Sequence, residues 1–218
     1  MLVDPPRALR RAALYSLLGA VAACRPSPPS VTPTATPAPA LVAGTWGSWR
    51  TLRAEHHVTV EAHVSESGGE RVDKRSLRGA IAVERPGRLR LRALGPGGIT
   101  LFDILIADGK AEVIEAVRDP SSGTFSRLLA SISGDLAAAF DLAPRPDSRR
   151  VSVEGNTVLV EEAGRTARLA DFHRVGGGLA PSRIVIDSRP AGGAPYHVEI
   201  EATHTTLDEP LDPALFTR

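Results

Sequence analysis

The fold is decided by residues 77–116, which read LRGAIAVERPGRLRLRALGPGGITLFDILIADGKAEVIEA. Four strand-like runs lie end to end in this stretch, at residues 77–84, 88–94, 99–107 and 110–117. Turn residues separate the runs: Arg85-Pro86-Gly87, the glycine- and proline-rich residues 95–98, and Asp108-Gly109, a strong hairpin signal. Because such short turns join antiparallel strands only, the stretch predicts an antiparallel meander.

Alternation along residues 88–94 gives this meander two unlike faces. Leu89, Leu91 and Ala93 point to one side, and Arg88, Arg90 and Arg92 point to the other. Residues 99–107 are apolar on both sides apart from Thr100 and Asp103, which indicates a strand near the middle of the sheet. The arginine row is either an ordinary solvated strand face or a surface that meets anionic lipid headgroups.

Further strands are expected on both sides of the meander. Residues 55–66 alternate, with His56, Val58, Val60, Ala62 and Val64 on one face and His57, Thr59, Glu61 and His63 on the other. Later strands are expected at residues 150–154, 157–162, 165–173, 182–187 and 196–205. A short helix over residues 44–53 would carry Trp46 and Trp49, whose rings either cap one end of the sheet or line a ligand site.

Helical periodicity is confined to the middle of the chain. Apolar residues recur at helical spacing at Phe125, Leu128, Leu129, Ile132, Leu136 and Phe140. Ser133-Gly134-Asp135 interrupts the pattern, so two short helices are predicted, at residues 125–132 and 135–141. Their apolar stripe needs the apolar face of the sheet as a partner. We therefore predict an α+β fold: an incomplete antiparallel half-barrel of about nine or more strands, closed by short lid helices.

Composition narrows the function classes. The formal net charge of the 218 residues is +1, and residues 1–23 carry +2 of it, which leaves about −1 for the remainder. That balance argues against general nucleic-acid binding. Cys24 is the single cysteine, so the chain holds no internal disulfide and no cysteine-based zinc site.

The N-terminus reads as an export signal. Arg7, Arg10 and Arg11 precede the apolar run at residues 12–20, which is too short for a permanent membrane span. Val21-Ala22-Ala23-Cys24 resembles the lipobox of bacterial lipoproteins, which implies attachment of diacylglycerol, typically carrying palmitate, to the Cys24 sulfur and cleavage between Ala23 and Cys24. The alternative is an ordinary signal peptide cut after its small residues. Arg25 follows the cysteine in place of aspartate, which by resemblance to Gram-negative lipoproteins favours the outer membrane.

Proline sets the domain organisation. Residues 25–40 read RPSPPSVTPTATPAPA and form a polyproline-type spacer. We thus expect a lipoprotein signal peptide at residues 1–23, a lipidated cysteine with a proline-rich tether at residues 24–43, and a folded domain at residues 44–218.

The folded part resembles the LolA/LolB-like lipoprotein carrier superfamily. The resemblance lies in residues 79–83, 85–91, 94–98 and 101–113, and in residues 211–216 at the C-terminus. It implies a half-barrel whose apolar cavity holds acyl chains. The residues that would line that cavity are Ile81, Val83, Leu89, Leu91, Leu101, Ile104, Phe125, Leu128, Leu129 and Ile132. The alternative is that these side chains fill the interior and leave no cavity.

The superfamily's outer-membrane receptor branch carries a protruding leucine between its third and fourth strands, which works at the membrane. The corresponding position here is Gly97, and Leu94 and Ile99 flank it as substitutes. This departure weakens the transfer of that activity to the chain.

Recognisable catalytic and cofactor motifs are absent from the sequence, so we expect no enzyme and no cofactor. Two polar rows, His57, Glu61 and His63, and His197, Glu199 and Glu201, read as solvated strand faces in preference to a metal site. The expected protein is a lipid-anchored, periplasm-facing outer-membrane lipoprotein of a Gram-negative bacterium that binds acyl chains or lipoproteins. The alternative is a structural or sensory lipoprotein that uses the same fold to bind a protein partner.

Overall fold

The structure is a computed structural model, and it describes residues 37–45, 47–66, 69–108, 110–116, 123–142, 147–191 and 193–217. The strands are β1 (Thr51–Glu66), β2 (Gly69–Glu84), β3 (Arg88–Leu94), β4 (Thr100–Ala107), β5 (Lys110–Ala116), β6 (Arg150–Glu154), β7 (Thr157–Glu162), β8 (Arg165–Val175), β9 (Gly178–Ser188) and β10 (Tyr196–Leu207). The helices are α1 (Pro39–Thr45) and α2 (Gly123–Ala139), with short 3₁₀ turns at Pro96–Gly98 and Pro213–Phe216. No helix within these ranges is both long and apolar enough to cross a membrane.

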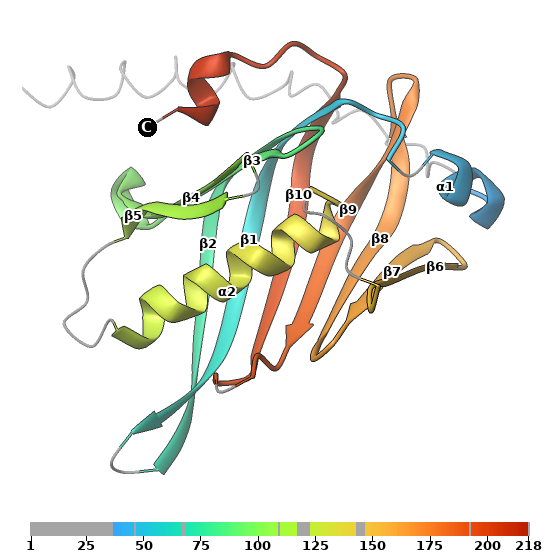
Figure 1. The fold of residues 1–218 in the computed structure, drawn as a ribbon. Helices are drawn as coiled ribbons and strands as arrows, with labels where there is room; N and C mark the ends of the chain where they lie inside the picture. Colours follow the sequence, from blue (N-terminus) through green and yellow to red (C-terminus); the bar gives the residue numbers. More distant parts are fainter. Residues whose placement is uncertain are drawn as a thin grey trace, which may run out of the picture. The chain divides into compact units, whose positions relative to one another are not determined.

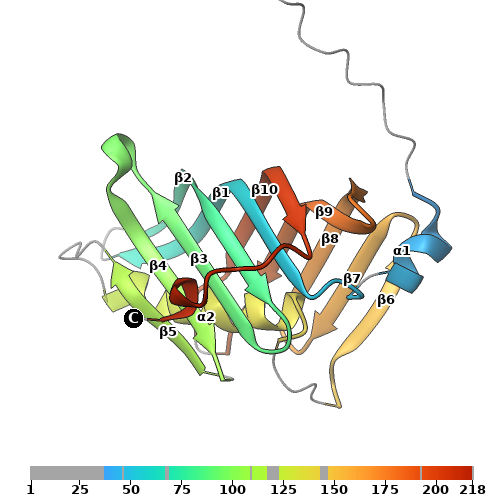
Figure 2. The ribbon, with the colours of Figure 1, turned by 90° about the horizontal axis from the view of Figure 1, so that it is seen from above.

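All ten strands belong to one antiparallel sheet, in the order β5-β4-β3-β2-β1-β10-β9-β8-β7-β6 (Figure 1). Strands β1 to β5 form one meander and β6 to β10 a second, and the two meet where β1 pairs with β10. The sheet curves without closing, because β5 and β6 are its two edges and do not pair with each other (Figure 2). The predicted α+β half-barrel is therefore confirmed.

This strand order explains the position of helix α2. It connects β5 to β6, the two edges of the sheet, so the chain must cross one face between them. Its 17 residues extend about 25 Å, whereas nine strand spacings in a flat sheet would span about 43 Å. The helix contacts β4 and β5 near one edge and β8 near the other (Figure 1). A single helix thus covers the inner face of the curved sheet.

The prediction of two short lid helices is wrong, because α2 continues through Ser133-Gly134-Asp135. The Ser133 hydroxyl donates to the Leu129 carbonyl one turn earlier at 2.7 Å, so its polar group is satisfied inside the helix. The helix ends later, where the Asp141 backbone adopts a φ of 56° and Leu142 N–H donates to the Ala137 carbonyl at 2.8 Å. This is a Schellman-type end, which closes the last turn.

Each face of the sheet has its own apolar cluster. The inner face and α2 share one large buried cluster, which also includes Val42 of α1 and Trp49. On the outer face, Phe216 packs with Ala82 and Leu105. The turn at Pro213–Phe216 therefore covers β3 and β4 on the side opposite to α2 (Figure 2).

The helix predicted over residues 44–53 lies earlier in the chain, at α1, and β1 already begins at Thr51. Trp49 is 2% exposed and meets Phe140 edge-on, with ring centroids 6.4 Å apart. The Arg85 guanidinium lies 3.9 Å from the centre of the Trp49 ring. Trp49 thus packs as a structural residue at the end of α2, while Trp46 lies outside the described residues.

Candidate functional site: the inner face beneath α2

Most of the predicted cavity residues meet on the inner face. Seven of them are no more than 2% exposed and belong to the one large cluster: Ile81, Val83, Leu89, Leu91, Ile104, Leu129 and Ile132. Strand register explains this, because Leu91 faces Ile81 on one side and Ile104 on the other. Helix α2 then brings Leu129 and Ile132 onto these strands, since residues three apart share one helix face.

Three predicted cavity residues are placed differently. Leu128 is partly buried at the margin of the cluster. Leu101 is half-buried, lies at the register shift between β3 and β4, and belongs to neither apolar cluster; its side chain occupies the space beside Gly95. The side chain of Phe125 lies outside the described residues, although its backbone belongs to α2.

The inner face extends well beyond the predicted set. Strands β7 to β10 supply a second half, made of Val158, Val160, Leu169, Ile184, Ile186, Val198 and Ile200. Their alternation is visible in the sequence, but only the pairing of β1 with β10 places them beside β1 to β4. The apolar surface beneath α2 therefore draws on both meanders.

One polar ring lies in the middle of this surface. His56 is 2% exposed, between Ala54 and Val58 on the same face of β1. Its ring nitrogens are buried beside the backbone of Ala80. Burial lowers the pKa of His56 to about 4, and a hydrogen bond with the Ala80 backbone opposes this shift only in part. At neutral pH the imidazole is therefore uncharged.

A polar network fastens the C-terminal half of α2 to the sheet. The Tyr196 hydroxyl of β10 donates to one carboxylate oxygen of Asp135, and the Arg165 guanidinium of β8 lies 2.7 Å from the other. Asp135 and Tyr196 are both buried, so their hydrogen bond lies in an environment with little water, whereas the Arg165 side chain is 30% exposed. Burial, reinforced by the neighbouring Asp135 carboxylate, raises the pKa of Tyr196 far above its usual range and keeps its proton in place.

The network continues to the edge of the sheet. Arg165 also lies 3.5 Å from Glu162, whose carboxylate accepts from the Arg149 guanidinium at 2.8 Å. Arg149 in turn lies 3.9 Å from Asp141, the residue that ends α2. Helix α2 is thus anchored at Asp135 and, just past its last residue, at Asp141, and it also contacts β4 and β5.

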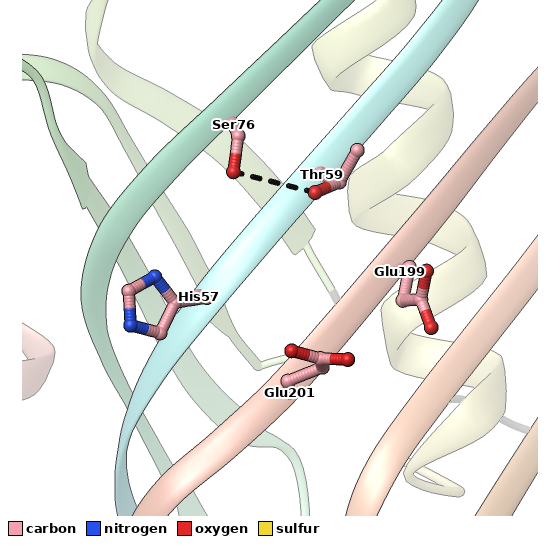
Figure 3. Close-up of a pocket in the computed structure, with 5 residues that line it drawn as sticks. All are labelled: His57, Thr59, Ser76, Glu199 and Glu201. Carbon is pink, nitrogen blue, oxygen red and sulfur yellow. Dashed lines mark hydrogen bonds between the residues drawn. The ribbon is translucent and has the colours of Figure 1, made fainter.

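The outer face carries a separate, polar pocket of about 300 Å³ (Figure 3). His57, Thr59, Ser76, Glu199 and Glu201 line it, from three neighbouring strands. The Thr59 hydroxyl donates to the Ser76 hydroxyl at 3.4 Å, and the His57 and Glu201 side chains lie on adjacent strands (Figure 3). The pocket lies between the two polar rows of the sequence.

Cross-strand ion pairs occupy much of those rows. Glu61 pairs with Lys74 at 2.5 Å, Glu199 with Arg183 at 2.5 Å, and His197 with Asp187 at 2.8 Å. Over the residues that the structure places, no three His, Cys, Asp or Glu side chains group as metal ligands. The rows act as solvated strand faces held by charge pairing.

The arginine row of β3 is also paired. Arg90 and Arg92 both donate to the carboxylate of Asp103, which is 2% exposed, and Arg90 further donates to the Leu215 carbonyl at 2.8 Å. Burial alone would raise the pKa of Asp103, but the hydrogen bonds from Arg90 and Arg92 outweigh it and hold that pKa below its usual range. The row fastens the C-terminal segment to the sheet, which leaves less free positive charge for lipid headgroups than the sequence predicts.

The loop between β3 and β4 is short and its tip is exposed. Gly95 N–H donates to the Ile99 carbonyl at 2.8 Å, and Gly97 has a φ of 72°, which favours glycine. Leu94 is half-buried, whereas Ile99 is 63% exposed. Of the predicted membrane-loop residues, Ile99 is the one that presents an apolar side chain to solvent. Cys24 and Ala23 lie outside the described residues.

No family model matches the chain, and no curated protein matches its sequence. Among solved structures it is similar to a LolA superfamily protein from Nitrosomonas europaea, with a TM-score of 0.47 and 10% identity over 84% of this chain and 98% of that one. It is also similar to an outer membrane lipoprotein-sorting protein domain from Vibrio parahaemolyticus, with a TM-score of 0.41 and 8% identity over 77% of this chain and 89% of that one. A third similar structure is a DUF1329 family protein from Desulfovibrio piger, with a TM-score of 0.37 and 12% identity over 78% and 90%.

Proposed function

We propose that this chain is a lipid-anchored, non-enzymatic lipoprotein that binds acyl chains, or the acyl groups of lipoproteins, on the inner face of its sheet. The observation that carries the proposal is the coverage of that face by one helix. Two meanders contribute a continuous apolar surface, and α2 is the element that separates it from solvent. Movement of the first turns of α2 would admit an acyl chain, and each buried CH₂ would contribute about 0.8 kcal/mol to binding.

The proposed location is the outer membrane, facing the periplasm, with the lipid on Cys24 and residues 24–43 as the tether. This anchor and tether would hold the acyl-binding face within about 50 Å of the membrane, since residues 24–38, which precede α1, would span about 3.1 Å each as extended polyproline chain. Transfer of lipoproteins or lipids at that membrane is the process that such a protein would serve.

Ile99 is the proposed point of membrane contact. A single exposed isoleucine on a tight loop can enter the interfacial region of a bilayer without disturbing the sheet. We expect Ile99→Ser to leave the thermal unfolding midpoint within about 2 °C of the wild type, because the side chain packs little. Binding to phosphatidylglycerol-containing vesicles should weaken about threefold, as measured by vesicle sedimentation of the Cys24→Ser chain. Equal sedimentation of the two chains would remove Ile99 from the proposal.

Acyl binding is tested at Leu128, which is partly buried at the margin of the cluster and not in its centre. We expect Leu128→Arg to weaken binding of a fluorescent C16 fatty acid at least tenfold, because a guanidinium beside the acyl chain is poorly solvated there. Val72→Arg on β2 is the matched control, since Val72 is 51% exposed and lies outside the cluster. Equal affinities for the wild type and both variants would contradict an inner-face site.

The second candidate function is a structural or sensory lipoprotein that binds a protein partner. The observation that favours it is the polar pocket at His57, Glu199 and Glu201 on the outer face, away from α2. A chain that binds no acyl probe, and whose partner interaction is lost on changing these residues, would support this reading over acyl binding.

A further inference from the structure

Strand β6 is one of the two edges of the sheet, and within the described residues it pairs only with β7. Four of its five residues are exposed, and the fifth, Val153, lies at the margin of the inner cluster. Val151 is 41% exposed although its side chain is apolar. Helix α1 contacts β6 and β7 and still leaves those four residues exposed. An edge strand of this kind offers a row of unpaired backbone groups to another strand.

The hairpin determines which backbone groups of β6 point to the free edge. A loop of two residues joins β6 to β7, with Glu154 opposite Thr157. In a two-residue hairpin the residues that flank the loop form a hydrogen-bonded pair, and such pairs alternate with non-hydrogen-bonded pairs along the strands. Strand β6 therefore bonds to β7 through Glu154 and every second residue before it. The N–H and C=O groups of Val151 and Val153 are left on the free edge.

We propose that β6 is a docking strand for a second copy of this chain, which pairs with it antiparallel about Ser152. In this register the free backbone groups of Val151 meet those of Val153 in the second copy, and the reverse pair forms by symmetry. Arg150 then lies opposite Glu154 of the second copy, and Glu154 opposite its Arg150, so two ion pairs flank the centre. A shift of the pairing by two residues would place Arg150 or Glu154 opposite Ser152 and lose both ion pairs.

The same register covers the exposed valine. Val151 and Val153 lie opposite Val160 and Val158 of β7, which belong to the buried cluster, so both side chains are on the inner face of the sheet. Pairing about the proposed centre places Val151 beside Val153 of the second copy on that face. The apolar inner surface would then continue across the symmetry axis.

The position of α1 agrees with this pairing. Helix α1 is the first element of the folded part and contacts β6 and β7, so the chain enters the fold beside this edge (Figure 2). The two-fold axis of an antiparallel edge pairing is perpendicular to the sheet, so both inner faces stay on the same side. An edge of five residues makes a small contact. Two copies on the proposed lipid anchor would share one membrane, which raises their effective concentration.

Disulfide trapping tests the centre of the register. Cys24 is the single cysteine, so Ser152→Cys in the full-length Cys24→Ser chain forms a disulfide only between copies. Arg150→Cys in the same background is the matched control, because the two copies of residue 150 would be about 14 Å apart, too far for a disulfide. At about 50 µM, with copper-phenanthroline as catalyst and dissolved oxygen as oxidant, non-reducing gels should show roughly tenfold faster cross-linking for Ser152→Cys.

Charge exchange tests the two ion pairs in the same Ser152→Cys background. Glu154→Arg alone would place arginine opposite arginine, and Arg150→Glu alone would place glutamate opposite glutamate. Each variant by itself should cross-link roughly threefold more slowly than the parent. An equal mixture of the two restores both ion pairs, so cross-links between unlike chains should recover the parent rate. This recovery also shows that both variants fold.

Equal cross-linking rates for Ser152→Cys and Arg150→Cys would overturn the proposal, and β6 would then be an edge that its own charges protect from pairing. Unchanged rates in both charge variants, or no recovery in their mixture, would overturn the register. None of these measurements depends on acyl binding, so their failure would leave the proposed function in place.

Discussion

At the scale of single residues, His56 gives the clearest prediction, because burial keeps its imidazole uncharged in the folded state. In the unfolded chain a histidine titrates near pH 6.5, so below that pH the unfolded state takes up a proton that the folded state refuses. This proton uptake does not affect stability above about pH 6.5, and it destabilises the folded state increasingly as the pH falls toward 4. Over that window we expect the free energy of unfolding to fall by roughly 3 kcal/mol.

Urea unfolding of the full-length chain at pH 7, 5.5 and 4.5 measures this effect, with His56→Leu as its control. The free energy of unfolding of His56→Leu should depend less steeply on pH in this window, because the variant lacks the group that takes up a proton in the unfolded wild type. Parallel pH profiles for the two chains would mean that His56 is solvated or paired in the fold.

The sequence predicted which face of β1 carries His56, because alternation placed it with Val58 and Val60. It did not predict that the ring lies over a glycine. That arrangement depends on the register of β1 against β2 and β10, which joins residues 23 and 146 positions apart. Alternation fixes the face of a side chain, whereas its neighbours across the strands depend on long-range pairing.

At the scale of secondary structure elements, α2 is the moving part of the proposed mechanism and Asp135 is its anchor. Tyr196→Phe removes the hydroxyl that donates to Asp135 and leaves the ion pair with Arg165 in place. Because this hydrogen bond is buried and reaches a charged group, we expect a loss of about 2 kcal/mol in unfolding free energy.

Hydrogen exchange locates the same effect within the chain. Backbone amides in the C-terminal half of α2 should exchange faster in Tyr196→Phe, while those of β1 and β2 change only with global stability. Uniform acceleration across the whole sheet would show that the network supports the fold in general and does not anchor the helix in particular.

The helix also shows where local sequence patterns fail. Ser133-Gly134-Asp135 reads as an interruption, since each residue has a low intrinsic helix preference. Tertiary contacts override that preference, through the bond from Ser133 to Leu129 and the partners of Asp135 on β8 and β10. The strands were easier to predict because their turn residues are local, although β9 begins at Gly178 and not at the predicted residue 182.

At the scale of the whole molecule, the order of the strands determines which residues form the inner face beneath α2. Two local meanders were predictable from turns and alternation, and so was a helical cover. The pairing of β1 with β10 was not, because it joins the beginning and the end of the folded chain. The inner face therefore draws on β1 to β4 and β7 to β10, whereas the strand residues that the sequence assigned to the cavity lie on β2, β3 and β4, and Leu101 is the one of them outside the buried cluster.

The central claim is that this protein carries acyl groups in two ways, covalently on Cys24 and non-covalently beneath α2. The most direct test is mass spectrometry of the full-length protein purified from bacterial membranes in a non-ionic detergent, once under denaturing and once under native conditions. The denaturing spectrum should show a chain that begins at Cys24 and carries a diacylglyceryl group. The native spectrum should show a further mass, which lipid extraction identifies as an acyl-containing molecule. A native mass equal to the denatured mass, with no acyl lipid in the extract, would contradict the account.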